Sequence, residues 1–295
     1  MRLRAELALI GVTIVWGTTF VVVKSALADI STFVFLALRF VIAAAALAII
    51  YRGALRKSGR RKALFPGLAA GTLLFTAYVF QTLGLELTTP SKSAFLTGLA
   101  IPMVPLASSL VYKSRPRLVE VAGILIASLG MVLMTLPPSL RFEMSRGDVL
   151  SFLCAVVFAL HIVIIGHYSP LIGYESLAVI QIAVAAAWGM LLFPFAEPVR
   201  FHFSTSVAVA VLVTGLLATA LAFTTMAWAQ QYTSATRAAL IFALEPVAAW
   251  LTSWALTGEN VANRGKVGAG MILAGILLGE FRKIRIETNP TKGAS

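Results

Sequence analysis

The stretch LALIGVTIVWGTTFVVV, residues 7–23, contains no charged side chain and lies between Arg4 and Lys24. A helix needs about 20 mostly apolar residues to cross a bilayer. The small residues Ala26 and Ala28 behind the stretch also fit the cleavage pattern of a secretory signal peptide, but the stretch is longer than a usual signal core. Because comparable runs recur along the chain, we interpret it as the first membrane helix.

The overall composition also favours lipid as the solvent. The 295 residues are 59% hydrophobic and 12% charged, with a mean hydropathy of +0.91, whereas a soluble domain is about 25% charged. The net charge of +12 would suit nucleic acid, but the basic residues stand in short clusters between apolar runs, as topology signals do. We therefore expect no nucleic-acid partner. The single cysteine, Cys154, excludes a disulfide framework and a thiolate metal site.

Apolar runs of spanning length recur ten times, and turn or stop signals rich in proline, glycine and charge separate them. We therefore predict an all-α integral membrane protein with ten transmembrane helices. The very short links near residues 90, 114 and 232 predict antiparallel hairpins. The runs are 5–24, 31–51, 64–87, 91–112, 117–136, 148–166, 175–196, 206–230, 234–256 and 261–281.

The distribution of lysine and arginine predicts the orientation. With the N-terminus inside, the cytoplasmic segments hold 15 lysines and arginines and the outer segments hold 7. Because short cytoplasmic loops are enriched in these residues, we expect both termini in the cytoplasm. The bias is strong in the first half and weak in the second, so the first half sets the orientation. We expect a multi-pass protein of the bacterial plasma (inner) membrane.

An internal repeat changes the interpretation of the ten runs. Shifting the chain by about 144 residues aligns several matching positions in order: Gly71 with Gly215, Thr89 with Thr233, Leu96 with Leu240, and Pro102 with Pro246. Chance matching among common residues is the alternative. Five helices per half is an odd number, so the halves would enter the membrane from opposite sides, with a site near the midplane between them. We predict inverted repeats at 1–138 and 139–284 and a cytoplasmic tail at 285–295.

Polar groups at mid-membrane depth are costly and indicate function. Glu245 is the only carboxylate that we place near the bilayer centre, next to Pro246, which weakens the helix there. It could couple protons or bind a cationic group of a substrate. Equally, it could form a buried ion pair with Arg39 or Arg237, or be protonated and hydrogen-bonded to the backbone. We assign Arg39 and Arg237 mainly structural roles as charge-pair or snorkelling residues.

Other candidates share helix faces at i, i+3, i+4 and i+7 spacing. His161 fits either proton handling or an interhelical hydrogen bond. Prolines 102, 105 and 246 predict kinked helices, and the glycine stripes 123/130 and 268/275/279 predict close helix packing or, alternatively, dimerisation. The full predicted substrate-binding set is Trp16, Thr19, Phe20, Tyr78, Gln81, Phe95, His161, Thr219, Met226, Gln230 and Glu245.

Several motifs together resemble the EamA-type branch of the drug/metabolite transporter superfamily over residues 5–283. They are Trp16-Gly17-Thr18-Thr19-Phe20 with Lys24, Ala37-Leu38-Arg39-Phe40, Glu245-Pro246 and Gly258-Glu259. The resemblance implies a ten-helix carrier of amino acids, nucleosides or other metabolites, often an exporter, with a central cavity between halves. The chain departs from the pattern at Lys113-Ser114-Arg115-Pro116, where Gly-Glu is expected.

We therefore predict a secondary transporter, working as an exporter of amino acids or similar amphipathic solutes by alternating access, and not an enzyme. The alternatives are an integral-membrane enzyme acting on a lipid-linked substrate and a nucleoside or vitamin carrier of the same fold. The chain has no Walker motif to supply ATP drive. We expect no cofactor and no metal. The expected partners are the lipid bilayer, a small-molecule substrate and protons as a candidate coupling ion, with the chain a monomer or homodimer.

Overall fold

The computed structural model of the chain describes residues 1–53, 60–113, 116–135, 145–258 and 263–284. Two predicted features lie outside these residues: the boundary between the two halves at 138/139, and the tail at 285–295. In the described part every one of the ten predicted apolar runs is helical. The only β pairing found there is an isolated bridge between Ile30 and Phe201.

The helices, in chain order, are α1 (Arg2–Ala26), α2 (Thr32–Ile50), α3 (Arg60–Leu87), α4 (Pro90–Gly98), α5 (Ala100–Tyr112), α6 (Leu118–Thr135), α7 (Arg146–Ile172), α8 (Tyr174–Ala196), α9 (Thr205–Leu212), the π-helix η2 (Val213–Leu221), α10 (Ala222–Ala229), α11 (Ala235–Phe242), α12 (Glu245–Thr257) and α13 (Asn263–Ile284).

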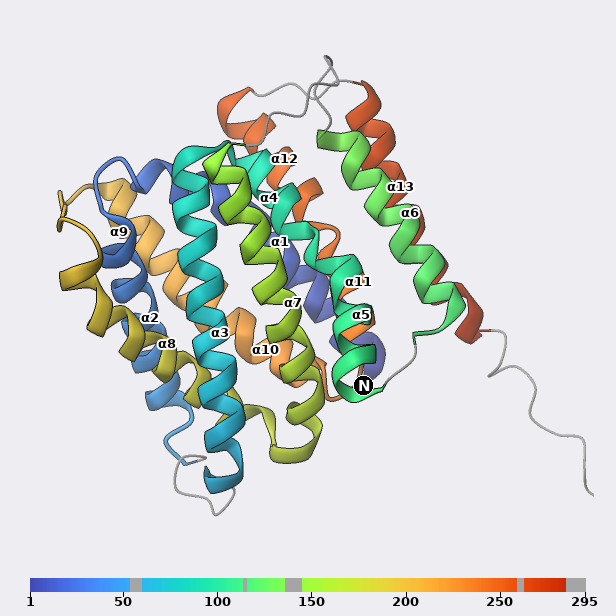
Figure 1. Ribbon diagram of the computed structural model, residues 1–295, viewed down its shortest axis with the longest axis horizontal. Helices are drawn as coiled ribbons and strands as arrows, with labels where there is room; N and C mark the ends of the chain where they lie inside the picture. The colour runs from blue at the N-terminus through green and yellow to red at the C-terminus, as the bar shows by residue number, and fades with distance from the viewer. Residues whose placement is uncertain (54–59, 114–115, 136–144, 259–262, 285–295) are drawn as a thin grey trace, which may run out of the picture.

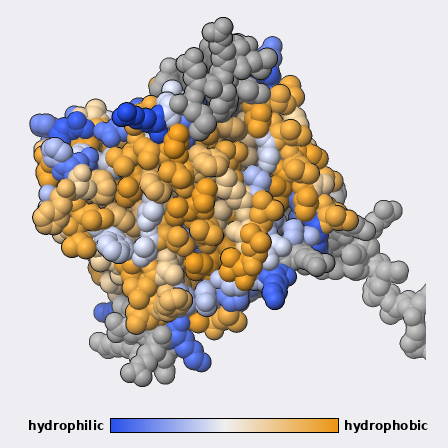
Figure 2. Space-filling view, in the orientation of Figure 1, coloured by the Kyte–Doolittle hydropathy of each residue, from blue (hydrophilic) through white to orange (hydrophobic). Residues whose placement is uncertain are grey.

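Eight helical segments in the described ranges are long and apolar enough to cross a membrane, counting α4–α5, α9–α10 and α11–α12 as one segment each. Helix α6 contributes a shorter apolar stretch, Leu118–Met134. Figure 2 shows a face that is mostly hydrophobic, with hydrophilic residues gathered toward its edges. An exposed surface of this kind requires lipid around it. The chain is a nearly all-helical, multi-pass membrane protein.

Two of the long segments are interrupted just before a proline, as the sequence predicted. The break at Leu99 separates α4 from α5 ahead of Pro102, and the break at Ala243 and Leu244 separates α11 from α12 ahead of Pro246. Proline clashes with the carbonyl four residues earlier, and those carbonyls belong to the last residues of α4 and α11. Each break therefore lies where the proline disturbs the helix.

The largest difference from a predicted boundary is at the end of α7. We predicted that the run from 148 would end at 166, before Ser169-Pro170, but α7 continues through Pro170 to Ile172. Pro170 lies in the last turn of the helix, where few backbone hydrogen bonds remain to be lost. The helix ends at Gly173, which takes φ of 86°; this left-handed region is open to glycine because it has no Cβ.

Helices α6 and α13 lie side by side along one edge of the molecule (Figure 1). An added Cβ at Gly123 would lie 2.5 Å from the carbonyl oxygen of Gly275, and one at Gly130 would lie 2.5 Å from that of Gly268. Small residues let two membrane helices approach this closely. The predicted close packing of the glycine stripes is confirmed. Helix α1 contacts α9, η2, α10, α11 and α12, and α3 packs against α7 and α8.

Candidate functional site

A cavity of about 50 Å³ lies among the central helices and can hold a few water molecules. It is lined from the C-terminal halves of α1 and α3, from α2, α7 and α10, and from the segments α4–α5 and α11–α12 near their breaks. Helices on both sides of the 136–144 gap thus contribute to it. The predicted site residues that line the cavity are Trp16, Thr19, Phe20, Tyr78, Gln81, His161, Met226 and Glu245, together with Arg39.

Aromatic rings form much of the cavity wall. The Trp16 ring centroid lies 5.2 Å from that of Phe223 and 5.2 Å from that of Phe242. Tyr78 packs edge-on against Phe158 and Phe223. The Trp16 indole Nε1 donates to the carbonyl oxygen of Ala218 in η2 at 2.9 Å, which fixes the ring in the wall. The cavity wall is therefore largely aromatic, with polar groups between the rings.

Arg39 is the arginine among the described residues that line the cavity. Its side chain is buried, its Nε donates to Thr219 Oγ1 at 2.7 Å, and its Cζ lies 3.9 Å from the centroid of the Tyr78 ring. These contacts tie α2 to η2 and α3 and include a cation–π interaction. The guanidinium group has five N–H donors, and Thr219 accepts from one of them. Arg39 is thus both a structural tie and a positive charge on the cavity wall.

Glu245 is the only carboxylate of the cavity wall. It is the first residue of α12, at the break before Pro246, and it is buried. Within the described residues its carboxylate makes no hydrogen bond and no ion pair. The sequence left open an ion pair with Arg39 or Arg237; in the structure Arg39 is bonded to Thr219, and Arg237 pairs with Glu6 and Glu120. The Glu245 carboxylate therefore remains available to a ligand.

His161 forms a hydrogen bond between its Nε2 and Gln181 Oε1 at 2.8 Å, which is the interhelical bond that the sequence offered as one alternative. Its Nδ1 is buried and has no partner in the described structure. At the other side of the cavity, the Gln81 amide donates to Thr97 Oγ1 at 3.4 Å. The wall thus holds several polar groups with spare hydrogen-bonding capacity.

Three predicted site residues lie outside the cavity wall. Phe95 is buried in a small apolar cluster between α4, α6, α11 and α13. Thr219 accepts the hydrogen bond from Arg39, and Gln230 donates to the carbonyl oxygen of Ile162 at 3.2 Å. All three side chains are buried, but the sequence does not distinguish a helix face that packs on another helix from one that faces a cavity.

The sequence analysis also missed lining residues. Phe158 and Phe242 line the cavity, and each lies three residues before a predicted site residue, His161 and Glu245. Residues three apart share a helix face, so this spacing is the signal that could have found them.

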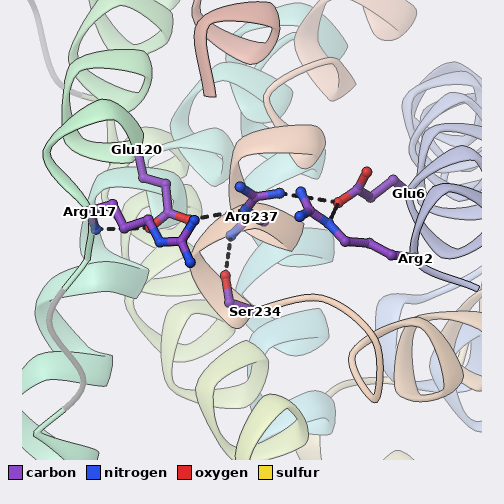
Figure 3. A network of polar contacts seen from close by, with 6 residues as sticks. All are labelled: Arg2, Glu6, Arg117, Glu120, Ser234 and Arg237. Carbon is purple, nitrogen blue, oxygen red and sulfur yellow. Dashed lines mark hydrogen bonds and ion pairs between the residues drawn. The ribbon is translucent and has the colours of Figure 1, made fainter. Parts of the chain in front are cut away.

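A second polar group lies far from the cavity, where the N-terminal ends of α1, α6 and α11 meet (Figure 3). Arg237 donates from Nε to Glu120 Oε1 at 3.0 Å and from Nη1 to Glu6 Oε1 at 3.5 Å. Arg2 donates from Nε to the same Glu6 oxygen at 2.6 Å. Glu120 Oε2 also accepts the backbone N–H of Arg117 at 3.0 Å. We call these five residues the ionic cluster.

The sequence model of the EamA-like transporter family matches the chain twice, over residues 3–136 and 145–279. The chain belongs to this family. Membership in the drug/metabolite transporter superfamily follows, so the resemblance seen in the motifs is confirmed. This EamA-like transporter has its cavity walled by helices from both matched regions.

Two proteins of Archaeoglobus fulgidus, both described as uncharacterized transporters, are similar over almost the whole length. One is 34% identical over 283 residues, 95% of this chain and 87% of the relative. The other is 23% identical over 286 residues, 94% of this chain and 98% of the relative. A protein of known crystal structure has a similar fold, with a TM-score of 0.78 and 22% identity over 98% of this chain and 100% of the other.

Proposed function

We propose that this protein is a secondary carrier that exports amino acids or similar amphipathic solutes by alternating access around the central cavity. The observation that carries the proposal is the pair of opposite charges on the cavity wall, the free Glu245 carboxylate and the Arg39 guanidinium, among aromatic rings. A zwitterion with an apolar side chain offers one partner for each of these three features. Export is the direction that the family resemblance favours.

In this proposal the chain crosses the membrane ten times, as two inverted five-helix repeats at 1–138 and 139–284. The two family matches and the two interrupted segments α4–α5 and α11–α12, each broken before a proline, support it. Both termini and the 285–295 tail lie in the cytoplasm of a bacterial cell, at its inner membrane. The excess of lysine and arginine in the segments that follow α2 and α5 supports this orientation.

Substrate exchange into proteoliposomes tests the substrate class. We expect at least one labelled amino acid to enter vesicles preloaded with the same unlabelled amino acid, well above protein-free vesicles, because the cavity offers a partner for each of its charged groups. A parallel panel of nucleosides and vitamins covers the other carriers of this fold. Exchange of nucleosides or vitamins alone, with no amino acid above background, would contradict the assignment.

A second arm of the same experiment addresses the enzyme alternative. Chemistry on lipid-linked substrates commonly uses a bound metal, and within the described ranges no three His, Cys, Asp or Glu side chains are grouped to hold one. Incubation of the proteoliposomes with labelled lipid-linked sugar phosphates is expected to return them unchanged. Time-dependent product formation would favour the enzyme.

A further inference from the structure

The ionic cluster stands well away from the cavity along the same face of α1. Glu6 is in the first turns of α1, and Trp16, ten residues later, lines the cavity; at 1.5 Å per residue the separation is about 15 Å. Between them Leu9 and Thr13 are fully buried on the same stripe of the helix. The chain is therefore tightly packed between the cluster and the cavity.

Three helix N-termini meet at the cluster, and each is the positive end of a helix dipole. Arg237 lies in the first turn of α11, three residues after the Ser234 cap, where a cation is unfavourable. Arg2 and Arg117 add positive charge at the starts of α1 and α6. Without the carboxylates of Glu6 and Glu120, this end would hold three guanidinium groups and three positive helix ends. The two carboxylates offset a repulsion that otherwise separates α1, α6 and α11.

All three bridging side chains are shielded from solvent: Arg237 is 7% exposed, Glu120 7% and Glu6 8%. Arg237 alone joins three helices, because it pairs with Glu6 of α1 and Glu120 of α6. A buried pair is strongly disfavoured when one partner is removed, since the other charge is left uncompensated. Separating Arg237 from the two glutamates therefore leaves buried charges unpaired unless water reaches them.

The opposite end of the molecule has two separate ion pairs, Lys92 with Asp148 and Arg200 with Glu86. Lys92, in the first turn of α4, bonds through Nζ to Asp148 Oδ2 of α7 at 2.6 Å. Asp148 also completes the Ser145 capping box, so it serves its own helix. At a shift of 144 or 145 the position of Glu120 corresponds to Arg264 or Gly265, and neither supplies a carboxylate. Among the described residues, an arginine that pairs with glutamates of two other helices is found only at the end where the ionic cluster lies.

We propose that the ionic cluster is a lock that keeps the cytoplasmic end of the carrier closed, and that Arg237 must part from Glu120 and Glu6 before the cavity opens to the cytoplasm. The inference rests on the proposed carrier function and topology. It goes beyond them by naming the contact that controls access from one side. The Lys92–Asp148 pair plays no part in this lock and provides a matched control.

Cysteine accessibility measures the opening directly. Cys154 is the only cysteine of the chain, so a Cys154→Ala background allows a single reporter, Thr13→Cys, on the buried stripe between cluster and cavity. Membrane-impermeant maleimide is applied to inside-out and right-side-out membrane vesicles carrying the full chain. The variants compared are Glu120→Gln, Glu6→Gln and, as control, Lys92→Gln.

We expect Glu120→Gln to raise the labelling rate from the cytoplasmic side about tenfold, as expected for the loss of one charge-assisted contact in a two-state equilibrium. We expect Glu6→Gln to raise the cytoplasmic labelling rate by a smaller factor, because Glu6 lies farther from Arg237 than Glu120 does. Lys92→Gln leaves the cytoplasmic rate unchanged. Gel filtration in detergent verifies that each variant is folded. If Glu120→Gln does not fold, the labelling rate of Glu6→Gln is compared with that of the control instead.

Three results would overturn the lock: no rise in the folded carboxylate variants, an equal rise in Lys92→Gln, or a rise confined to the outer side. Labelling needs no substrate, so its outcome is independent of the exchange assay. If no amino acid is exchanged but labelling rises in the carboxylate variants, the proposed substrate class is contradicted and the lock is supported. If amino acids are exchanged but labelling does not rise in these variants, the carrier function is supported and the lock is rejected.

Discussion

Gly130→Ala is expected to destabilise the protein by about 3 kcal/mol through overpacking. The higher helix propensity of alanine offsets up to about 1 kcal/mol of this cost. The added Cβ would lie 2.5 Å from the carbonyl oxygen of Gly268, 2.9 Å from Met271 Cβ and 3.0 Å from Ile272 N. Two of these are backbone atoms, which cannot rotate away. The two helices must therefore separate along their contact, and neighbouring atoms lose dispersion contacts as well.

The matched control is Gly270→Ala, in α13 itself. An added Cβ there meets nothing within 4 Å, so the helix gains alanine without a clash. We expect the thermal unfolding midpoint in detergent, followed by circular dichroism, to fall for Gly130→Ala and to stay level or rise for Gly270→Ala. Equal midpoints for the two variants would show that close contact of α6 with α13 does not support the fold.

The helical fold could be predicted from the sequence because each of its signals is local. A bilayer requires long apolar helices, so runs such as 7–23 mark their helices directly. The breaks ahead of Pro102 and Pro246 follow from the chemistry of proline within one helical turn. The contact of Gly123 with Gly275 was visible only as two glycine stripes, since their pairing depends on how α6 and α13 come together.

The site was predictable in part, for a reason that its charged residues illustrate. Glu245 stood out as costly at its depth, and it does line the cavity. The partners of Arg237 were not foreseen, because Glu120 and Glu6 are 117 and 231 residues away along the chain. Phe95 shows the converse case, because it is buried against other helices and does not line the cavity. Periodicity identifies buried faces and does not say what covers them.

Glu245→Gln is expected to lower the rate of amino acid exchange about 10- to 100-fold, since a hydrogen bond to a charged group contributes about 1.5–3 kcal/mol and each 1.4 kcal/mol is a factor of ten. Glutamine keeps the size of the side chain and removes only the charge. The fold should therefore persist. The variant should lose binding of either the substrate's ammonium group or a coupled proton.

The two roles of Glu245 differ in their dependence on pH and on the substrate. If the carboxylate binds the ammonium group, Glu245→Gln raises the half-saturating concentration for amino acids and spares analogues that lack the amine. If it carries a proton, the variant loses the pH dependence of exchange for every substrate. Glu175→Gln, in the first turn of α8 outside the cavity wall, is the control and should exchange as the wild type does. Unchanged rate and pH dependence in Glu245→Gln would remove Glu245 from both roles, leaving Arg39 as the one charged side chain of the wall to recognise the substrate.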